Sequence, residues 1–375
     1  MDALGPADHV RLAPARHAPR SARETAEGRH WRRYKEVSVT RQVRRGGGGG
    51  WTRGREGGTG TARPTRPPSR PAPAQVGGVS HIHFCEAAPH DFAVTASTRV
   101  HLFAGRTRAP RGAASRFPDV AHCGVFRADG AALAAGCSDG TVRLFDARTR
   151  GLLRQMAGHA APARAVAFGA DKLALASGGD DATVRLWDPA AGAATGRLDG
   201  HTDYVRALAA APASPHAFLS GGYDHAVKLW DARAGTCVAT LDHGAPVEAV
   251  VYLPGAGLCA SAGGTVVKVW DALSRSTTPL AVLAAHQKTV TCLAAAASAG
   301  AGAAAGARLL TGSLDGRVRA FDLTTFAPAH AWRLGAPVTA LALSPDGGRT
   351  LVVGCGDGTL AVRAAPKRAG GGAAR

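Results

Sequence analysis

Short stretches that alternate apolar and polar residues recur along most of the chain at a nearly constant interval. Six of them align on an aromatic residue, and a seventh ends with Arg363 at the same position. The aromatic residues are Phe103, Phe145, Trp187, Trp230, Trp270 and Phe321. The successive intervals are 42, 42, 43, 40, 51 and 42 residues. This interval matches the 40–45 residues that one four-stranded blade of a β-propeller requires.

Each repeat has the same internal order. An apolar strand is followed about ten residues later by a second one that ends in small residues, as in AFLSGG and RLLTGS. A tight turn with Asp and Gly comes next, and then the alternating strand. Short alternating strands between turn residues indicate a β-sheet, and no helical stripe interrupts them. The one long interval contains an Ala/Gly-rich insertion, residues 294–307, which we expect to be a loop.

Seven repeats predict an all-β fold, a single seven-bladed propeller over residues 79–363. A closed propeller needs its last blade completed, because closure removes exposed sheet edges. The alternation around Val37 and Val39 makes residues 36–40 the natural closing strand. The remainder of 1–78 is rich in Arg, Gly and Pro and cannot bury enough apolar area to order, and the tail 364–375 is similar. We expect both to be mostly disordered.

Charge and cysteine content limit the class of protein and its cellular location. The net charge is +18. Residues 1–78 hold 16 Lys+Arg and 6 Asp+Glu, so more than half of the excess lies in that extension. No apolar run is long enough to span a bilayer, and the start lacks the apolar region of a secretory signal. Seven cysteines without a CxxC pair argue against disulfides and a zinc site. We therefore expect an intracellular protein with no membrane partner.

Motifs for catalysis or cofactor binding are missing from the sequence. There is no metal-ligand cluster, P-loop, nucleophile elbow or dinucleotide fingerprint. The glycine run 46–50 lacks the Lys-Ser/Thr and the strand–helix context of a phosphate loop. We expect no enzyme, no cofactor, no metal and no small-molecule substrate, which leaves an interaction scaffold.

The repeats resemble the WD40 family, as DATVRLWD, HAVKLWD and TVVKVWD illustrate. The resemblance implies that a His before the first strand, a Ser or Thr on the second, an Asp in the turn and an aromatic residue on the third form a hydrogen-bonded network in each blade. The matching sets are His159, Ser177, Asp181 and Trp187; His201, Ser220, Asp224 and Trp230; and His286, Thr311, Asp315 and Phe321. A fourth set keeps His243, Ser261 and Trp270 but has Gly264 where Asp is expected.

A Ser-His-Asp set could also suggest a catalytic triad. Here, however, the set recurs at the blade interval, which a single active site would not do. We interpret these residues as structural, because a buried carboxylate needs hydrogen-bond partners.

Several segments depart from the general WD40 consensus and resemble a narrower family, the U3 small nucleolar RNA-associated WD-repeat subunits of the small-subunit processome. They include HGAPVEAV, SAGGTVVKVWD, HQKTVTCL and, near the start, HWRRYK. The resemblance implies a nuclear, nucleolar protein that acts in ribosomal RNA transcription and 18S precursor processing during ribosome biogenesis. Its implied partners are other WD-repeat subunits, with pre-rRNA or the U3 particle contacted indirectly. The family also carries a helical domain after the propeller, which this sequence, ending at Arg375, does not contain.

The segment 44–74 interrupts a stretch that in that family runs almost directly into the first blade. One interpretation is an RGG-like arm in which Arg44, Arg45, Arg53 and Arg55 contact RNA phosphates and Trp51 stacks on a base. The other, which we favour, is a low-complexity linker or translated intron sequence, because charge-rich segments are usually just solvated.

Two tyrosines could lie on the loop face of the propeller. Tyr204 begins a strand and Tyr223 precedes the turn residue Asp224. Exposed tyrosines are good anchors for a protein partner, but packing between blades is an equally good interpretation.

A different class of function, substrate receptor of a cullin-type ubiquitin ligase, has one motif in its favour. Trp230, Asp231 and Arg233 match the WDxR pattern of such receptors, and residues 145–148 nearly match it. The motif is short and arises readily after any WD dipeptide, so we keep this function as the alternative.

Overall fold

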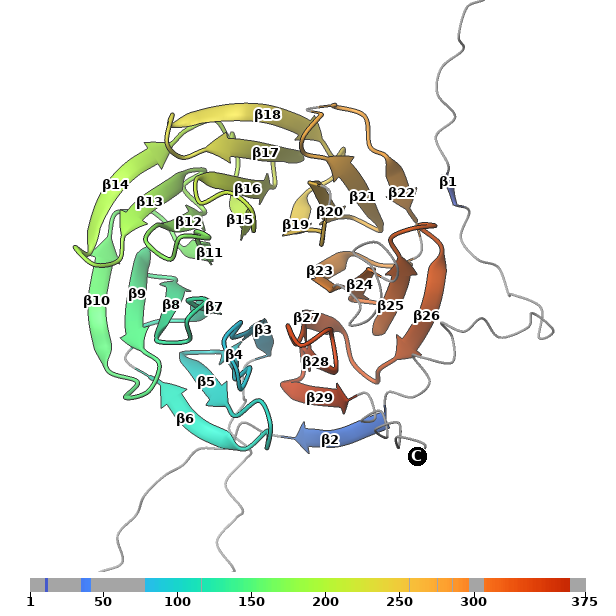
Figure 1. The fold of residues 1–375 in the computed structure, drawn as a ribbon, viewed down its shortest axis with the longest axis horizontal. Coiled ribbons are helices and arrows are strands. Elements are labelled where there is room, and N and C mark those ends of the chain that lie inside the picture. The colour runs from blue at the N-terminus through green and yellow to red at the C-terminus, as the bar shows by residue number, and fades with distance from the viewer. Residues whose placement is uncertain are drawn as a thin grey trace, which may run out of the picture.

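The computed structural model describes residues 11–12, 35–41, 78–115, 117–255, 257–274, 276–284, 286–296 and 307–364. In these residues the chain forms 29 strands and no helix. They build seven sheets arranged as the blades of a closed ring, with the chain passing from blade to blade in order (Figure 1). The predicted all-β, seven-bladed propeller is confirmed. None of the described segments is a helix that could cross a membrane.

Each blade contributes one strand to the wall of the central channel. These inner strands are β3 (Val79–Phe84), β7 (Ala121–Phe126), β11 (Ala163–Phe168), β15 (Val205–Ala210), β19 (Val247–Tyr252), β23 (Val290–Ala296) and β27 (Val338–Leu343). The second strands are β4 (Phe92–Ala96), β8 (Ala132–Cys137), β12 (Leu175–Gly179), β16 (Ala217–Gly222), β20 (Leu258–Gly263), β24 (Arg308–Ser313) and β28 (Thr350–Cys355).

The outer half of each blade follows in the same order. The third strands are β5 (Arg99–Phe103), β9 (Thr141–Asp146), β13 (Val184–Asp188), β17 (Ala226–Asp231), β21 (Val266–Asp271), β25 (Arg317–Asp322) and β29 (Thr359–Ala364). The outer strands are β6 (Pro110–Ala114), β10 (Leu152–Ala157), β14 (Ala193–Leu198), β18 (Thr236–Asp242), β22 (Ala281–Leu283), β26 (Pro328–Arg333) and, in the seventh blade, β2 (Lys35–Arg41).

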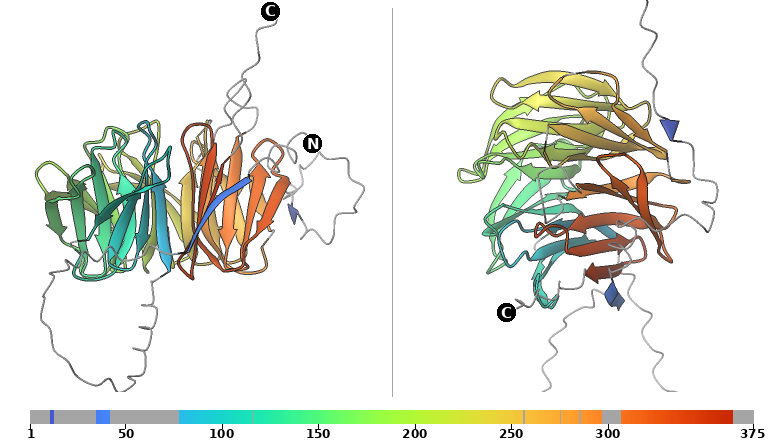
Figure 2. Two further views of the ribbon diagram at one scale, coloured as in Figure 1. Left: turned by 90° about the horizontal axis from the view of Figure 1, so that it is seen from below. Right: turned by 45° about the vertical axis from the view of Figure 1, so that its right-hand side comes forward.

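The seventh blade is completed from the N-terminal side of the chain. Strand β2, drawn in blue, lies beside the last strands of the chain (Figure 2). It pairs antiparallel with β29, with Val39 opposite Ala361. The predicted closing strand, 36–40, lies within β2. A short strand β1 (Arg11–Leu12), which sequence patterning did not predict, runs parallel to β22 at the outer edge of the fifth blade. Residues 294–296 of the predicted insertion belong to β23, because their backbone continues the pairing with β24 as far as Ala296 and Arg308.

The core lies between neighbouring blades rather than inside one sheet. One cluster joins Val79, Ile82 and Phe84 of β3 to Val352 of β28 and Val362 of β29. The second strands are covered on both faces, and all six residues of β8 are buried. This explains the small residues at their ends: a Cβ on Gly221 would lie 2.5 Å from Val247 of the next blade. Larger residues there would push the blades apart.

Candidate interaction surface at the channel mouth

A β-bulge recurs at the start of every inner strand. In all seven blades the pairing with the second strand shifts between the first and third residues. At a bulge the extra residue breaks the alternation of side chains between the two faces of the sheet, so its side chain points in a new direction. The seven residues at this position, which we call the bulge ring, are Ser80, His122, Arg164, Arg206, Glu248, Thr291 and Thr339.

The bulge ring lines a cavity of about 340 Å³ at the axis of the propeller. All seven inner strands contribute to its wall. In the antiparallel blades this end of the channel is the one that carries the turns between second and third strands. We call it the channel mouth.

Three members of the bulge ring hold adjacent blades together through hydroxyl groups. Ser80 Oγ donates to the carbonyl of Ala121 at 3.5 Å, Thr291 Oγ1 to that of Val338 at 2.8 Å, and Thr339 Oγ1 to that of Val79 at 2.6 Å. Each acceptor is the first residue of the next inner strand. The bonds therefore join blade 1 to blade 2, blade 6 to blade 7, and blade 7 to blade 1.

The other four members carry imidazole or charged groups and form a continuous polar arc over blades 2 to 5. Arg164 Nη2 lies 2.6 Å from Asp180 Oδ2, and its Nη1 lies 3.2 Å from His122 Nδ1. His122 Nε2 in turn lies 2.7 Å from Ser138 Oγ. Burial, with the positive charge of Arg164 and Arg206, lowers the pKa of His122 to about 4. The imidazole is therefore neutral at neutral pH, and it can accept from Arg164 Nη1, which lies 3.2 Å from Nδ1 and 3.1 Å from Nε2.

The arc continues through Arg206 into blade 5. Arg206 Nη1 lies 3.9 Å from Asp180 Oδ1, and the guanidinium carbon lies 5.0 Å from the centre of the Tyr223 ring. The Tyr223 hydroxyl donates to Glu248 Oε1 at 2.6 Å. Burial and this carboxylate raise the pKa of Tyr223. Tyr223 thus spans the gap between blades 4 and 5 and keeps its proton.

Of the two candidate anchor tyrosines, Tyr204 is the more exposed, since Tyr223 is half-buried. Tyr204 is 47% exposed, and its ring centre lies 6.3 Å from that of Tyr223. The Tyr223 amide donates to the Tyr204 carbonyl at 2.9 Å, which fixes the two residues relative to each other. Tyr223 therefore has the inter-blade packing role, while Tyr204 is available for a partner.

The arc has no excess of either charge. Two guanidinium groups, of Arg164 and Arg206, face two carboxylates, of Asp180 and Glu248; Arg164 bonds Asp180 directly, and Glu248 accepts from Tyr223. A balanced, hydrogen-bonded surface with an aromatic residue above it is suited to recognising a protein by shape and polar pattern. Each arc residue occupies the polar second position of an otherwise apolar strand, a periodic signal that our sequence interpretation did not use.

Each predicted network forms within its own blade, close to the turn between the second and third strands. In blade 3, His159 Nδ1 lies 2.9 Å from Asp181 Oδ1 and its Nε2 lies 2.6 Å from Ser177 Oγ. Trp187 Nε1 donates to the same Oγ at 2.8 Å. In blade 4, His201, Ser220, Asp224 and Trp230 repeat the arrangement with distances of 2.6–2.8 Å.

The proton positions follow from these contacts. The Trp187 indole N–H can only donate, so the Ser177 oxygen accepts from it. The Ser177 O–H then donates to His159 Nε2. The remaining ring proton, on Nδ1, then donates to Asp181. Burial lowers the pKa of His159, which keeps the ring neutral, and hydrogen bonds lower the pKa of Asp181. Ser177 is completely buried, so no substrate can reach its hydroxyl as it would in a hydrolase.

Two blades vary this network. In blade 6, His286 bonds Asp315 at 3.1 Å and Thr311 at 2.7 Å, while Phe321 fills the aromatic position without a donor. In blade 5, where Gly264 replaces the Asp, His243 meets Ser261 through Nδ1 at 2.8 Å and donates from Nε2 to the Gly263 carbonyl at 3.3 Å.

Blade 2 has a network that our sequence interpretation missed. Its turn carboxylate, Asp139, is held by Arg143 Nη2 at 3.1 Å and by the Thr141 hydroxyl at 2.6 Å. The guanidinium of Arg143 lies 5.9 Å from the centre of the Phe117 ring. Phe117 precedes the inner strand, where blades 3 to 6 have His. The signal was the missing His together with an Arg on the third strand.

The adaptor-like motif is explained mainly by the fold. Trp230 is 1% exposed and bonds Ser220. Asp231 accepts from the amides of Arg233 and Ala234, at 2.9 and 3.3 Å, which stabilises the turn after the third strand. The same turn recurs at Asp146, Asp188, Asp271 and Asp322. Only the exposed side chain of Arg233 is left for a partner.

The proposed RNA contacts, Arg44, Arg45, Trp51, Arg53 and Arg55, lie outside the described residues. Within the described ranges, no group of three or more His, Cys, Asp or Glu is placed to hold a metal ion. Six of the seven cysteines are buried, and Cys237 is exposed.

Comparison with protein families agrees with the observed blades. The model of the WD domain, G-beta repeat, matches residues 118–146, 150–188, 192–231, 235–271, 277–322 and 323–362. These six matches correspond to blades 2 to 7.

Among curated proteins, the chain is similar to proteins named U3 small nucleolar RNA-associated protein 15 or its homolog. It is 52% identical to the human and 53% identical to the mouse protein over 289 residues, 77% of this chain and 54% and 53% of theirs. It is 34% identical to the Schizosaccharomyces pombe protein over 354 residues, 94% of this chain and 63% of that protein. The chain spans about half the length of the curated animal relatives it matches.

Proposed function

The chain belongs to the WD40 repeat family, and we propose that it is a non-enzymatic scaffold subunit of the small-subunit processome. In this role it acts in ribosomal RNA transcription and in processing of the 18S rRNA precursor. The observation that carries the proposal is the similarity, at 52% identity to the human protein, to proteins named for their association with the U3 small nucleolar RNA.

The geometry supports a scaffold rather than a catalyst. The recurrent Ser-His-Asp sets are buried and satisfy one another. What the described part of the chain offers to other molecules is a rigid ring with a polar, balanced arc at one end. Rigid scaffolds lose little conformational freedom on binding, which favours stable assembly.

We place the contact with a neighbouring WD-repeat subunit at the channel mouth, around Tyr204. Its ring is exposed, and the amide contact with Tyr223 holds it in position. Aromatic residues of this kind contribute strongly at the centre of protein interfaces. On this proposal pre-rRNA and the U3 particle are reached through partner proteins, and the protein resides in the nucleolus.

The test is affinity purification of the tagged chain from cells of its own source, with fluorescence imaging of the same tag. We expect a nucleolar signal and co-purification of U3 RNA, 18S precursors and other WD-repeat processome subunits. A diffuse cytoplasmic signal with no rRNA-processing partner would refute the proposal. Recovery of a cullin adaptor instead, lost on Arg233→Ala, would favour the ubiquitin-ligase alternative.

A further inference from the structure

A second cavity, of about 460 Å³, opens at the other end of the propeller, between blades 1 and 2. It is bounded by the turns between first and second strands of both blades and by the turn between third and outer strands of blade 2. In an antiparallel blade these turns lie opposite the channel mouth. We call this cavity the blade 1–2 pocket.

The floor of the blade 1–2 pocket is apolar. Leu102 and Phe126 are 3% and 5% exposed, and Cys85 is 4% exposed. Burial raises the pKa of the Cys85 thiol, so it is neutral. Ala87, Pro89 and Ala147 complete the apolar lining. A cavity of this size and lining can take one or two apolar side chains.

The rim, by contrast, is basic. Arg111, Arg148 and Arg150 line it together with two carboxylates, Asp91 and Asp129. Both carboxylates already have partners. Asp91 Oδ2 lies 2.5 Å from Arg111 Nη1, and Asp129 forms a two-point ion pair with Arg127 at 3.0 and 2.9 Å.

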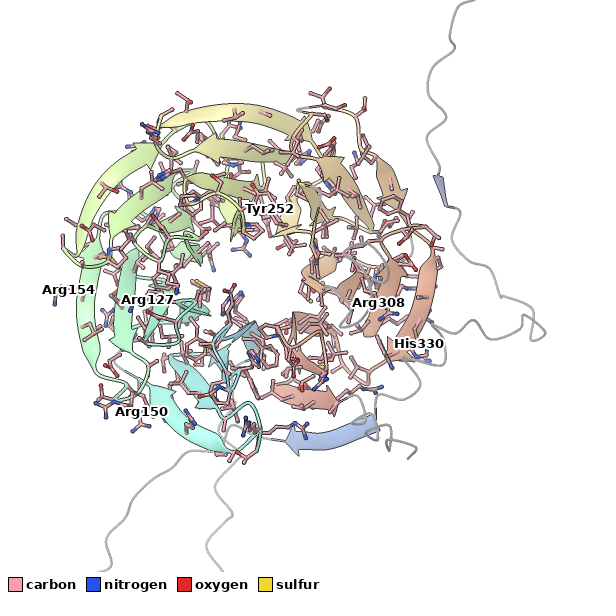
Figure 3. The ribbon with its side chains drawn as sticks, in the orientation of Figure 1. Arg127, Arg150, Arg154, Tyr252, Arg308 and His330 are labelled. Atoms are coloured by element: carbon pink, nitrogen blue, oxygen red, sulfur yellow. The ribbon has the colours of Figure 1, made fainter. Side chains whose placement is uncertain are left out.

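Neither Arg148 nor Arg150 forms an ion pair in the described residues, although the charge of Arg148 contributes, after the hydrogen bonds from Thr149, to lowering the pKa of Asp146. Within the described part of the chain, no acidic side chain lies in ion-pair distance of either guanidinium, and both residues are exposed. Arg150 Nη1 instead donates to the backbone carbonyl of Arg111. Its side chain lies over Gly112, where a Cβ would come within 2.9 Å of Nη1. Figure 3 shows Arg150 beside the ends of β6 and β10.

The backbone at Arg150 is unusual for its residue type. Its φ is +62°, and its amide donates to the carbonyl of Asp146. Blades 3 and 4 close the same turn with Gly192 and Gly235, at φ +72° and +68°, and blades 1 and 6 with Arg108 and Phe326, at φ +58° and +53°. The left-handed turn position therefore accepts glycine as well as larger residues, so replacing Arg150 by Gly is compatible with the fold.

From this arrangement we propose that the blade 1–2 pocket binds an acidic peptide segment of a partner protein. An apolar side chain of the peptide enters the floor, and flanking Asp or Glu carboxylates pair with Arg148 and Arg150. Guanidinium groups bind carboxylates through two parallel hydrogen bonds, which gives strength and direction. The site is separate from the channel mouth, and it does not depend on the processome assignment.

Charge and shape favour this occupant over two others. The chain's own extension, residues 1–78, has ten more basic than acidic residues and does not complement an arginine rim. RNA binding to single strands relies on exposed aromatic faces, whereas the only aromatic ring of the lining, Phe126, is 5% exposed.

The experiment uses the full chain and a fluorescent octapeptide with Leu at its centre and Asp and Glu on both sides, in 150 mM salt. Fluorescence polarisation measures its affinity, alongside a peptide with Lys in place of the acids and a peptide with Ser in place of Leu. Uridine-rich RNA serves as a competitor. A photoreactive group at the Leu position locates the contact by cross-linking.

The test variant combines Arg148→Ala with Arg150→Gly. The second change introduces the residue that blades 3 and 4 have at this φ, so the fold should be retained. The matched control is Arg233→Ala, because Arg233 occupies in blade 4 the turn position of Arg148. We expect the double variant to bind the acidic peptide at least tenfold more weakly and the control to bind it unchanged.

Cross-links should fall on residues 85–91, 126–130 or 147–150. Unchanged affinity in the double variant, cross-links elsewhere in the chain, or no binding of the acidic peptide would each overturn the proposal. Equal binding of the Ser peptide would refute the apolar part of the site. If RNA binds the chain and the double variant weakens that binding, the ligand of the blade 1–2 pocket is a nucleic acid, and the peptide proposal is wrong.

Discussion

His243 meets Ser261 through Nδ1, whereas the histidines of blades 3, 4 and 6 meet the equivalent hydroxyl through Nε2. The difference follows from Gly264, which replaces the turn carboxylate. Without that acceptor the ring donates from Nε2 to the backbone carbonyl of Gly263. Burial lowers the pKa of His243 to about 4, and the Gly263 carbonyl and the charge of Asp242 offset this only in part.

We expect Asp181→Ala and Asp224→Ala to destabilise the propeller. Each removes the acceptor of a buried imidazole N–H, whose loss costs about 1–3 kcal/mol of unfolding free energy. Urea denaturation followed by tryptophan fluorescence measures the change. Asp199→Ala is the control, because the side chain of Asp199 is 64% exposed and, among the described residues, its one ion pair is with exposed Arg197; its effect should stay below about 0.5 kcal/mol. A wild-type midpoint for Asp181→Ala would exclude its role in the network.

We expect stability to fall as the pH is lowered from about 6.5 towards 4. Burial holds the pKa of His83 at about 3 and that of His243 at about 4, below the ordinary 6.5. The unfolded chain therefore binds protons that the folded chain does not, so acid favours unfolding. Each such histidine contributes up to about 1.4 kcal/mol per pH unit. Unfolding free energies at pH 7.5, 6 and 5 test this, and equal values at all three would contradict it.

Ala182→Gly and His225→Gly should stabilise the protein by up to about 1 kcal/mol each. These residues have φ of +60° and +65°, in the turn where blades 2 and 6 have Gly140 and Gly316. Glycine relieves a left-handed strain of about 1–2 kcal/mol, partly offset by its greater freedom when unfolded. Thermal denaturation measures the gain. Gly316→Ala is the converse variant and should lower the melting temperature.

The two tyrosines of the channel mouth should respond differently to substitution. Tyr223→Phe removes a hydrogen bond to the Glu248 carboxylate and should cost about 1.5–3 kcal/mol of stability. Tyr204→Ala should leave stability within about 0.5 kcal/mol, because the ring is exposed, yet reduce co-purification of partner subunits. Intact partner recovery with Tyr204→Ala would move the interface away from this residue.

The basic extension provides a separate prediction about RNA. Replacing Arg44, Arg45, Arg53 and Arg55 by Gln should weaken low-salt, sequence-independent RNA binding, since arginines neutralise phosphates. The slope of log K against log salt should fall by at most about 2.8, at 0.7 for each phosphate contact on a single strand. Titration of a uridine-rich RNA at several salt concentrations measures this. An unchanged slope would place RNA contact elsewhere or nowhere on the chain.

Local periodicity in the sequence was sufficient to determine the number of blades, most strand positions and the members of the networks in blades 3 to 6. His201, Ser220, Asp224 and Trp230, for example, all belong to one repeat, so their spacing along the chain already encodes their proximity. The closing strand was predictable for a related reason: a strand with Val37 and Val39, far from other strands, has a place only at the open edge of blade 7.

Only the tertiary structure determined the contacts between side chains of neighbouring blades. Arg164 meets His122, and Tyr223 meets Glu248, across neighbouring blades. Spacing does not indicate such contacts, because they depend on how one sheet is set against the next and on the bulge that re-aims each side chain. The blade 1–2 pocket has the same origin: Arg111 and Arg148 belong to different blades. In this fold the residues within a repeat determine the blades, and the packing of one blade on the next creates the surfaces on which partners can bind.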